Sequence, residues 1–253
     1  MYAPERHQQI LETARANGRV EVSGLARDLA VTPETVRRDL SALERRGVIR
    51  RVHGGAIPVE RLGSEPGIAD REGRASSQKD RIARAALDEL PEGGSIILDA
   101  GTTTVRLAEL LPLDRELTVV THSIPVAHVL SSRPNINLHL LGGVVRPRTL
   151  AAVGEWTKAQ IAELFVDVAF MGINGISVER GLTTADVAEA SVKRAIVAAS
   201  RRIVVLADHT KFGREEFAMV APLSVVDTVI TDLELDVELA EDVENAGPRM
   251  VIV

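Results

Sequence analysis

The sequence predicts two folded parts: a small helical domain with a β-hairpin, followed by a larger α/β domain built on a largely parallel sheet. Three observations support this. Within about 60 residues the chain shows three short helix patterns and one hairpin pattern. The next stretch is rich in Pro, Gly, Ser and charge, as in a connector. Strand and helix patterns then alternate, which is typical of parallel sheets. We place the first domain at 1–60, a linker at 61–78 and the second domain at 79–253.

The composition is that of a globular protein without disulfides. Of the 253 residues, 45% are hydrophobic and 26% are charged, which is enough for a buried core. No cysteine is present, and this excludes disulfides and thiolate chemistry. No apolar run approaches the roughly 18 residues of a membrane span, and the first residues lack the apolar region of a signal peptide. We therefore expect a cytoplasmic protein with no membrane partner.

Charge is distributed unevenly along the chain. The net charge is -6, yet residues 1–62 carry 11 Arg against 8 acidic residues, so +3, and the remainder carries 19 basic and 28 acidic residues, so -9. A basic end on an acidic body suits contact with a polyanion through one end only. Of the 30 basic residues 26 are Arg, and such a bias draws attention to the few Lys because the two side chains differ chemically. These are Lys79, Lys158, Lys193 and Lys211.

Two helices are expected first. Residues 4–17 place Ile10 and Ala14 on one apolar face, and Gly18 ends the helix. Ser23 is then expected to cap a second, short helix, because a Ser side chain accepts a hydrogen bond from the first helical turn. A tight break after this second helix leads to a third helix, as in a helix-turn-helix.

The third helix carries the strongest signal. Thr32 is expected to cap it and Pro33 to take the first helical position, where the missing N–H costs nothing. The pattern runs to Arg46, with Gly47 as the residue that follows the helix. The buried stripe consists of Val36, Leu40 and Leu43. The residues away from that stripe are polar: Glu34, Thr35, Arg37, Arg38, Ser41 and Arg45.

Such a helix suits the major groove of DNA. An apolar back packs on the domain, while Arg and Thr near the N-terminus reach base edges and phosphates. Two short apolar strands then flank His53-Gly54-Gly55, which predicts a hairpin, the wing of a winged helix-turn-helix. Each piece alone is an ordinary solvated helix or turn, and only their order favours double-stranded DNA as the partner. The candidate DNA-binding residues are Thr32, Glu34, Thr35, Arg37, Arg38, Ser41, Arg45, Arg50, Arg51, His53 and Gly54.

The second domain repeats strand, loop and helix. Strands are expected at 95–98, 117–121, 136–141, 166–171, 203–207, 226–230 and 250–253, and helices at 79–90, 102–111, 124–130 and 186–199. In sheets of this kind ligands bind at the carboxyl ends of the strands. Small and polar residues gather at those ends here.

The strand-end clusters favour an anionic, hydroxylated ligand. Gly101-Thr102-Thr103 leads into a helix N-terminus, where free N–H groups, hydroxyls and the helix dipole favour a phosphate. Alone, this loop is also explained as a Thr-rich helix start, and it matches no nucleotide-binding motif. Lys211 is a candidate phosphate contact and Asp208 a candidate hydroxyl acceptor. The candidate effector-binding residues are Asp99, Gly101, Thr102, Thr103, Thr121, His122, Gly142, Gly143, Asp208 and Lys211.

Neither a metal nor a cofactor is expected. The six histidines form no i, i+4 pair and no HExxH motif. Arg71, Arg74 and Lys79 could touch an anion, but a solvated linker is the preferred interpretation of their segment.

These motifs resemble the DeoR family of bacterial regulators. The resemblance lies in Val36-Arg37-Arg38-Asp39-Leu40, in Arg51-Val52-His53-Gly54-Gly55-Ala56, in Leu98-Asp99-Ala100-Gly101-Thr102-Thr103 and in Asp208-His209-Thr210-Lys211-Phe212, and it covers nearly the whole chain. It implies an operator-binding winged helix-turn-helix and an effector domain similar in fold to ribose-5-phosphate isomerase that binds phosphorylated sugars. His122 stands where the family often has Asn.

Several stretches most resemble regulators of fructose-uptake operons, among them residues 1–62 and 148–153. This implies fructose-1-phosphate or fructose-1,6-bisphosphate as effector, with repression relieved when it binds. Two DNA half-sites imply a homodimer or homotetramer. Two alternatives stay open: a sugar-phosphate isomerase-like enzyme, for which Asp99, Asp208 and Glu189 offer a carboxylate base, and an architectural protein that answers no ligand. The enzyme is the less favoured, because a DNA-binding segment is fused to it.

Overall fold

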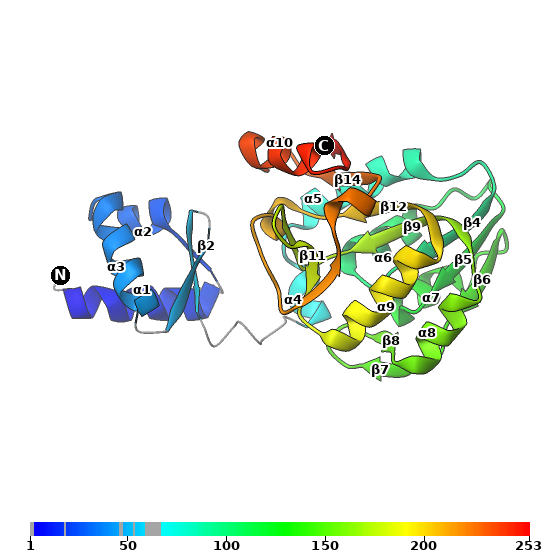
Figure 1. The fold of residues 1–253 in the computed structure, drawn as a ribbon, viewed down its shortest axis with the longest axis horizontal. Helices are drawn as coiled ribbons and strands as arrows, with labels where there is room; N and C mark the ends of the chain where they lie inside the picture. The colour runs from blue at the N-terminus through cyan, green and yellow to red at the C-terminus, as the bar shows by residue number, and fades with distance from the viewer. Residues whose placement is uncertain (1–2, 18, 46–47, 53, 59–66) are drawn as a thin grey trace. The chain divides into compact units, whose positions relative to one another are not determined.

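The computed structural model describes residues 3–17, 19–45, 48–52, 54–58 and 67–253. The chain divides into two compact units, Met1–Glu65 and Pro66–Val253, which we call the first unit and the second unit (Figure 1). The predicted division into a small and a large part is present, and each unit is described by itself.

The first unit consists of three helices and a small antiparallel sheet. The helices are α1 (Ala3–Asn17), α2 (Val22–Asp28) and α3 (Pro33–Arg45). The strands are β1 (Val20–Glu21), β2 (Ile49–Val52) and β3 (Gly55–Pro58), in the order β1-β3-β2. Ile10, Leu25, Val36, Leu40 and Ile49 are among the side chains of its buried core. The predicted hairpin and the buried stripe of the third helix are confirmed.

Two cap predictions have different outcomes. Thr32 caps α3 as predicted, since the N–H of Thr35 donates to Thr32 Oγ1 at 3.2 Å and Pro33 is the first helical residue. The prediction for Ser23 is wrong: α2 begins at Val22, so Ser23 lies inside the helix. The helix begins earlier because Val22 directly follows β1, and its N–H still donates to Gly54 O of the hairpin at 2.9 Å. Arg46 and Gly47, expected at the end of α3, lie outside the described residues.

A seven-stranded parallel sheet forms the centre of the second unit, in the order β15-β14-β12-β9-β4-β5-β6. The predicted fold class is therefore confirmed. Its strands are β4 (Gly94–Leu98), β5 (Leu117–Thr121), β6 (Ile136–Leu140), β9 (Val166–Gly172), β12 (Ser200–Leu206), β14 (Thr228–Thr231) and β15 (Arg249–Ile252). The chain starts in the middle and adds strands first on one side of β4 and then on the other, so the order reverses between β4 and β9.

Helices cover both faces of this sheet (Figure 1). Side chains alternate along each strand: Ile96 and Leu98 of β4 join the core under one helical layer, and Ile97 joins the other. The first layer consists of α5 (Ser76–Ala85), α6 (Thr102–Leu110) and α7 (Ile124–Leu130). The second consists of α8 (Glu155–Ala162), α9 (Val187–Ala198) and α10 (Val237–Asn245).

The second unit contains elements that the sequence pattern did not predict. They are the hairpin of β7 (Val144–Arg146) and β8 (Ala151–Val153), helices α8 and α10, and the small sheet of β10 (Gly175–Ser177), β11 (Gly181–Thr184) and β13 (Ala218–Ala221). The linker prediction also needs correction. Residues 67–78 belong to the second unit and contain α4 (Ile68–Glu72) and the start of α5. Among the described residues no helix is long and apolar enough to cross a membrane.

Candidate functional site

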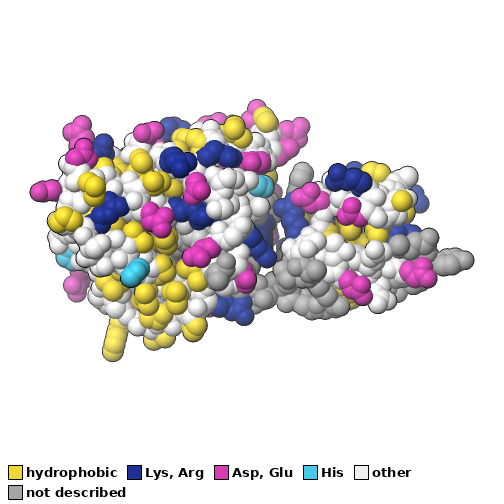
Figure 2. Space-filling model, turned by 180° about the vertical axis from the view of Figure 1, so that it is seen from behind, with side chains coloured by type: hydrophobic (Ala, Val, Ile, Leu, Met, Phe, Trp, Pro, Cys, Tyr) yellow, Lys and Arg dark blue, Asp and Glu magenta, His cyan; other side chains and the backbone are white. Residues whose placement is uncertain are grey.

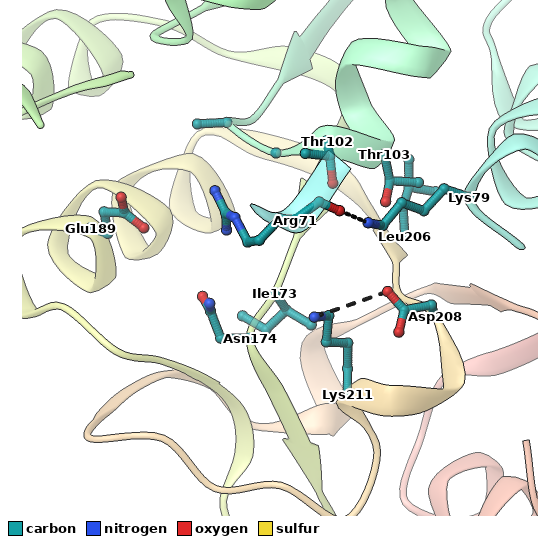
Figure 3. A pocket seen from close by; sticks show the side chains of 13 residues that line it. Arg71, Lys79, Thr102, Thr103, Ile173, Asn174, Glu189, Leu206, Asp208 and Lys211 are labelled. Carbon is teal, nitrogen blue, oxygen red and sulfur yellow. Dashed lines mark hydrogen bonds and ion pairs between the residues drawn. The ribbon is translucent and has the colours of Figure 1, made fainter. Parts of the chain in front are cut away.

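A pocket of about 480 Å³, part of it open to solvent, lies where the strand order of the large sheet reverses. Residues following β4, β9 and β12 contribute to it, as expected for the carboxyl edge of a parallel sheet. Figure 3 shows the side chains that surround it. The lining residues are Arg71, Lys79, Ala100, Gly101, Thr102, Thr103, Gly172, Ile173, Asn174, Glu189, Leu206, Asp208 and Lys211.

The N-terminus of α6 forms one wall. Gly101 precedes the helix, and no side chain caps it. Thr102 and Thr103 are buried side chains that line the pocket, so their hydroxyls face it together with the first N–H groups of the helix. These N–H groups have no helical acceptor, and the helix dipole adds positive charge. Thr104 instead turns inward and donates to Asp99 O at 2.7 Å.

Three cationic side chains line the same pocket. Lys79 donates to Arg71 O at 2.5 Å and to Arg74 O at 2.6 Å, and its burial lowers its pKa to about 8. Burial also lowers the pKa of Lys211, although Asp208, 4.0 Å away, acts in the opposite sense. Burial of Asp208 would raise its pKa, but Lys211 and the bonds from Thr210 outweigh this and keep the pKa below its usual value. The third cation is Arg71, from α4.

Oxygen-bearing side chains complete the lining. Glu189 is bonded by Arg146 and by the hydroxyl of Thr149 at 2.5 Å, and its carboxylate and the Arg71 side chain extend toward one another in Figure 3. Asn174 Oδ1 accepts from Thr184 Oγ1 at 2.7 Å, which leaves the amide N–H₂ as its donor. Cations, hydroxyls, an amide and carboxylates around one cavity suit a ligand with both anionic and hydroxyl groups.

The structure brings five of the ten predicted effector residues together at the pocket: Gly101, Thr102, Thr103, Asp208 and Lys211. The other five lie elsewhere. Asp99 and His122 are fully buried beneath the pocket floor, where Asp99 is bonded by Lys193 and lies 2.9 Å from His122 Nε2. His122 Nδ1 donates to Ala152 O at 2.8 Å. Burial would raise the pKa of Asp99, yet Lys193 and His122 together hold it at about 2.

Local hydrogen bonds and close packing explain the residue types at Thr121, Gly142 and Gly143. The buried Thr121 hydroxyl donates to Leu98 O at 2.7 Å. Gly142 N–H donates to Gln160 Oε1 at 3.2 Å, and its carbonyl accepts from Thr157 Oγ1 at 2.8 Å. Gly143 has φ +157°, and a Cβ there would come within 2.1 Å of Thr157 Oγ1. Their place at strand ends was correctly predicted, but these strand ends do not line the pocket.

Sequence reasoning missed several residues of the pocket and its floor. Arg71 lies in the predicted linker and Lys79 directly follows it, so neither was expected to line a pocket, although the scarcity of lysine was a usable signal. Three of the four lysines lie in the pocket or beneath it: Lys79, Lys193 and Lys211. Asn174 lay in a stretch without any strong pattern. Glu189 was considered only as a base for an enzyme.

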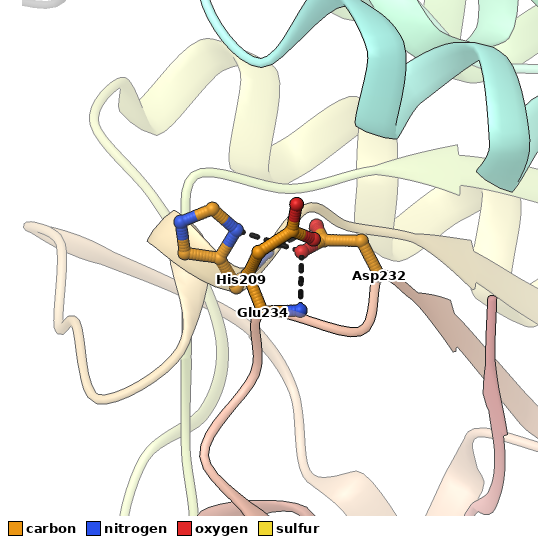
Figure 4. A group of neighbouring side chains, drawn as sticks. All are labelled: His209, Asp232 and Glu234. Carbon is orange, nitrogen blue, oxygen red and sulfur yellow. Dashed lines mark hydrogen bonds and ion pairs between the residues drawn. The ribbon is translucent and has the colours of Figure 1, made fainter.

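A second cluster, next to the pocket residue Asp208, contains His209, Asp232 and Glu234 (Figure 4). Each offers a ligand atom within 4.8 Å of the others. However, Asp232 already accepts from the His209 backbone N–H at 2.9 Å and lies 2.8 Å from His209 Nδ1. Glu234 is bonded to Arg81 at 3.0 Å. These bonds make the cluster a hydrogen-bonded junction between two strand ends.

In the first unit the predicted polar face of α3 is exposed. The side chains of Arg37 and Arg38 are 55% and 81% exposed, and both approach Glu34, at 3.5 and 3.7 Å. Arg51 on β2 donates to Ser41 Oγ at 3.3 Å, which joins the wing strand to this face. Thr32, Arg45, Arg50 and Gly54 are exposed, and Thr35 is half-buried. His53 lies outside the described residues.

On the opposite side of α3, Asp39 is buried. Arg6 of α1 donates two hydrogen bonds to the Asp39 carboxylate, from Nε at 2.5 Å and from a terminal nitrogen at 2.9 Å. His7 Nε2 lies 2.9 Å from the same carboxylate. Burial would raise the pKa of Asp39, but Arg6 and His7 lower it below the usual value. The carboxylate therefore fixes α3 on α1 with the arginine face outward.

Two family models match the chain. The model for the DeoR-like helix-turn-helix domain matches residues 6–61, and the model for the DeoR C terminal sensor domain matches residues 74–233. The HTH-type transcriptional regulator GlpR of Haloferax volcanii is 38% identical over 99% of this chain and 98% of its own length. A protein of Bacillus subtilis, the uncharacterized HTH-type transcriptional regulator FruR, is 35% identical over 92% of this chain and 93% of its length. The glycerol-3-phosphate regulon repressor of Escherichia coli is 34% identical over 92% of both.

Among solved structures, ribose 5-phosphate isomerase A from Methanocaldococcus jannaschii matches 55% of this chain and 55% of its own, with a TM-score of 0.41 and 17% identity.

Proposed function

The chain belongs to the DeoR family of transcriptional regulators, and we propose that it represses a carbohydrate operon until a phosphorylated sugar binds in the second unit. The pocket carries this proposal, because it combines a helix N-terminus with Arg71, Lys79 and Lys211. The alternative of an isomerase-like enzyme is not supported, since the similar proteins are named as transcriptional regulators.

The first unit is proposed to bind operator DNA through the exposed face of α3. Arg37 and Arg38 near its N-terminus would reach base edges or phosphates in the major groove, and Arg50 and Arg51 of the wing would contact the adjacent backbone. The pairs with Glu34 are long and solvent-exposed, so they are worth little and yield easily to phosphates.

In the second unit the phosphate would bind at the N-terminus of α6, against Lys79 and Lys211. The hydroxyls of the sugar would then meet Asp208, which lies beside Lys211, and Asn174 and Glu189 farther along the pocket. Two phosphate groups would need two cationic ends, whereas one phosphate and several hydroxyls need one cationic end and one end with acceptors. At the other end the charge of Arg71 faces the Glu189 carboxylate, so the pocket lining suits the second description better.

The identity of the sugar is proposed on the resemblance to fructose-operon regulators. The relatives are named for different systems: one is called FruR, and another is a glycerol-3-phosphate regulon repressor. Fructose-1-phosphate is the first choice, because it combines one phosphate with a hydroxyl-rich body. Fructose-1,6-bisphosphate and glycerol-3-phosphate are the comparison ligands.

A homodimer or homotetramer is proposed as the binding form, since operators carry two half-sites. Hydrophobic side chains gather toward the lower edge of the larger unit in the view of Figure 2. Exposed large hydrophobic residues of the second unit include Leu140, Val144, Trp156, Phe165, Phe217 and Leu233. A second copy of the chain is proposed to cover part of the exposed hydrophobic surface of the second unit.

The test is a titration of operator affinity against a panel of ligands. Fructose-1-phosphate is expected to weaken operator binding, while unphosphorylated fructose has no effect. Lys211→Gln should abolish the response. Lys158→Gln should keep it, because Lys158 lies on α8, does not line the pocket and pairs with Glu155 at 3.0 Å. A flat response to every phosphorylated sugar would instead favour an architectural protein.

A further inference from the structure

Helix α4 is the first described element of the second unit, and it directly follows the division between the units at Glu65 and Pro66. It is only five residues long, from Ile68 to Glu72. A helix this short has no intrinsic stability, so its position depends on contacts with the rest of the unit. One of these is the bond from Ile68 N–H to Arg148 O, at 2.9 Å.

Lys79 makes two further contacts with this segment. Its ammonium donates to the carbonyl oxygens of Arg71 and Arg74, at 2.5 and 2.6 Å. The first carbonyl belongs to α4 and the second to the turn that follows. An ammonium has three donors, so these bonds engage two of them. The same side chain lines the pocket, where an anion is proposed to bind.

Arg71 connects α4 to the pocket a second time. Its backbone carbonyl accepts from Lys79, while its side chain lines the pocket (Figure 3). An anion in the pocket therefore meets both a side chain of α4 and the lysine that holds the α4 backbone. Both interactions draw α4 toward the ligand.

The turn after α4 is strained. Ala75, which precedes α5, has φ 49° and ψ 42°, the left-handed region. This conformation is unfavourable for an alanine, because its Cβ comes too close to the following carbonyl oxygen. The strain at Ala75 favours a change of the turn to another conformation. The hydrogen bonds from Lys79 to Arg71 O and Arg74 O oppose that change. The charge of Lys79 also matters for these bonds. Burial lowers the pKa of Lys79 to about 8, and a nearby anion would stabilise the charged ammonium that donates to the two carbonyls.

We propose that α4 is a clasp which an anionic effector fastens to the second unit, with Lys79 joining the effector to the α4 backbone. This inference rests on the proposed function, because it assigns the regulatory role to the same pocket. Fastening the clasp fixes the end of the second unit from which the chain leads to the first unit. Effector occupancy thereby changes the mobility of residues 68–74, which follow the division between the units.

Hydrogen exchange of the full-length protein tests the clasp directly. With saturating fructose-1-phosphate, the amides of residues 68–74 should exchange about tenfold more slowly, equivalent to about 1.4 kcal/mol of added local stability. The amides of α10 serve as the internal control, because none of its residues lines the pocket. Fructose-1,6-bisphosphate and glycerol-3-phosphate are measured in parallel, and calorimetry establishes which of the three binds.

A pair of alanine substitutions gives an independent test. Ala75→Gly removes the left-handed strain, so it should favour the fastened clasp and raise effector affinity about fivefold, which corresponds to about 1 kcal/mol. Ala30→Gly is the matched control: Ala30 is also left-handed, with φ 52°, but it lies in the first unit. Its effector affinity should equal that of the wild type.

The outcomes separate the two proposals. A ligand that binds by calorimetry without slowing exchange at 68–74 would overturn the clasp and leave the sensor function intact. Equal effector affinity of Ala75→Gly and wild type would also count against the clasp. If none of the three ligands binds, the proposed function fails and the clasp fails with it.

Discussion

Each unit contains a buried aspartate held by one cation and one histidine, and the two arrangements differ in depth. In the first unit, Asp39 is bonded by Arg6 and lies 2.9 Å from His7, and its side chain remains 7% exposed. In the second unit, Asp99 is bonded by Lys193, lies 2.9 Å from His122 Nε2 and is fully buried. The first cluster fastens one helix to another. The second fastens backbone, since Asp99 Oδ2 accepts from Gly172 N–H at 3.0 Å and Lys193 donates to Gly172 O at 2.8 Å.

This difference shows what each unit has to keep rigid. The first unit must present one face of α3. The Asp39 cluster behind the helix is sufficient for this, because the exposed side chains of Arg37 and Arg38 can change conformation while the helix stays in place. The second unit must hold the backbone of Ala100, Gly101 and Gly172 around a pocket, which requires bonds from beneath the floor. Full burial makes those bonds stronger, but it also makes the loss of one charge more costly.

The largest expected effect is that of Asp99→Ala. It leaves the Lys193 ammonium buried without its counter-charge, so the second unit should lose about 3–5 kcal/mol of unfolding free energy. Urea unfolding followed by circular dichroism measures this, with Asp88→Ala as an exposed acidic control. A loss below about 1 kcal/mol would show that the Asp99 cluster is no more sensitive to loss of its aspartate than the Asp39 cluster.

The corresponding change in the first unit, Asp39→Ala, should cost less. Hydrogen bonds to a charged group contribute about 1.5–3 kcal/mol, and here solvent partly compensates for the loss. Hydrogen exchange of α1 and α3 should report the loss, together with weaker operator binding, because α3 is no longer fixed on α1. The exposed Asp28→Ala on α2 is the control, and equal behaviour of the two variants would show that the Asp39 cluster does not fix α3.

The outer face of α3 can be tested without disturbing Asp39. Arg37→Ala and Arg38→Ala should each weaken operator binding about tenfold while leaving the unfolding free energy unchanged, because both side chains are exposed. Arg84→Ala, an exposed residue of α5, is the matched control for loss of one positive charge. Footprints identical to those of the wild type would show that α3 does not read the DNA.

The smallest expected effect is the pH dependence of the pocket. The pKa of Lys79 is lowered to about 8, so the side chain loses its charge as pH rises through that value. An anion prefers the charged form, so affinity for fructose-1-phosphate should fall about threefold between pH 7.5 and 8.5, as the charged fraction falls. Lys211, whose pKa is also lowered, acts in the same direction. Lys79→Arg, which keeps its charge, should flatten the decline measured by calorimetry, and an unchanged decline would point to other groups.

Local patterns were sufficient for much of the fold. The bounds of α7 and β5 agree with the expected ranges, because a Ser-Ile-Pro start and a short run of β-branched residues are strong local signals. Helix α8 was missed because only Thr157 and Ile161 are buried on it, and two residues make no periodic stripe. Strands β7 and β8 have three residues each, too few to show alternation.

By itself, the sequence determined the parallel α/β class, the capped third helix with Arg37 and Arg38 outward, and the glycine and threonine loop that begins α6. These depend on residues close together in the chain, whose periodicity and capping are visible without a partner. Only the tertiary structure decided which polar residues meet. It places Asp99 and His122 in the interior, where Asp99 bonds Lys193, and it brings Arg71 of the predicted linker and the following Lys79 to the pocket. Contacts across 94 positions of sequence, as between Asp99 and Lys193, leave no periodic trace in the chain.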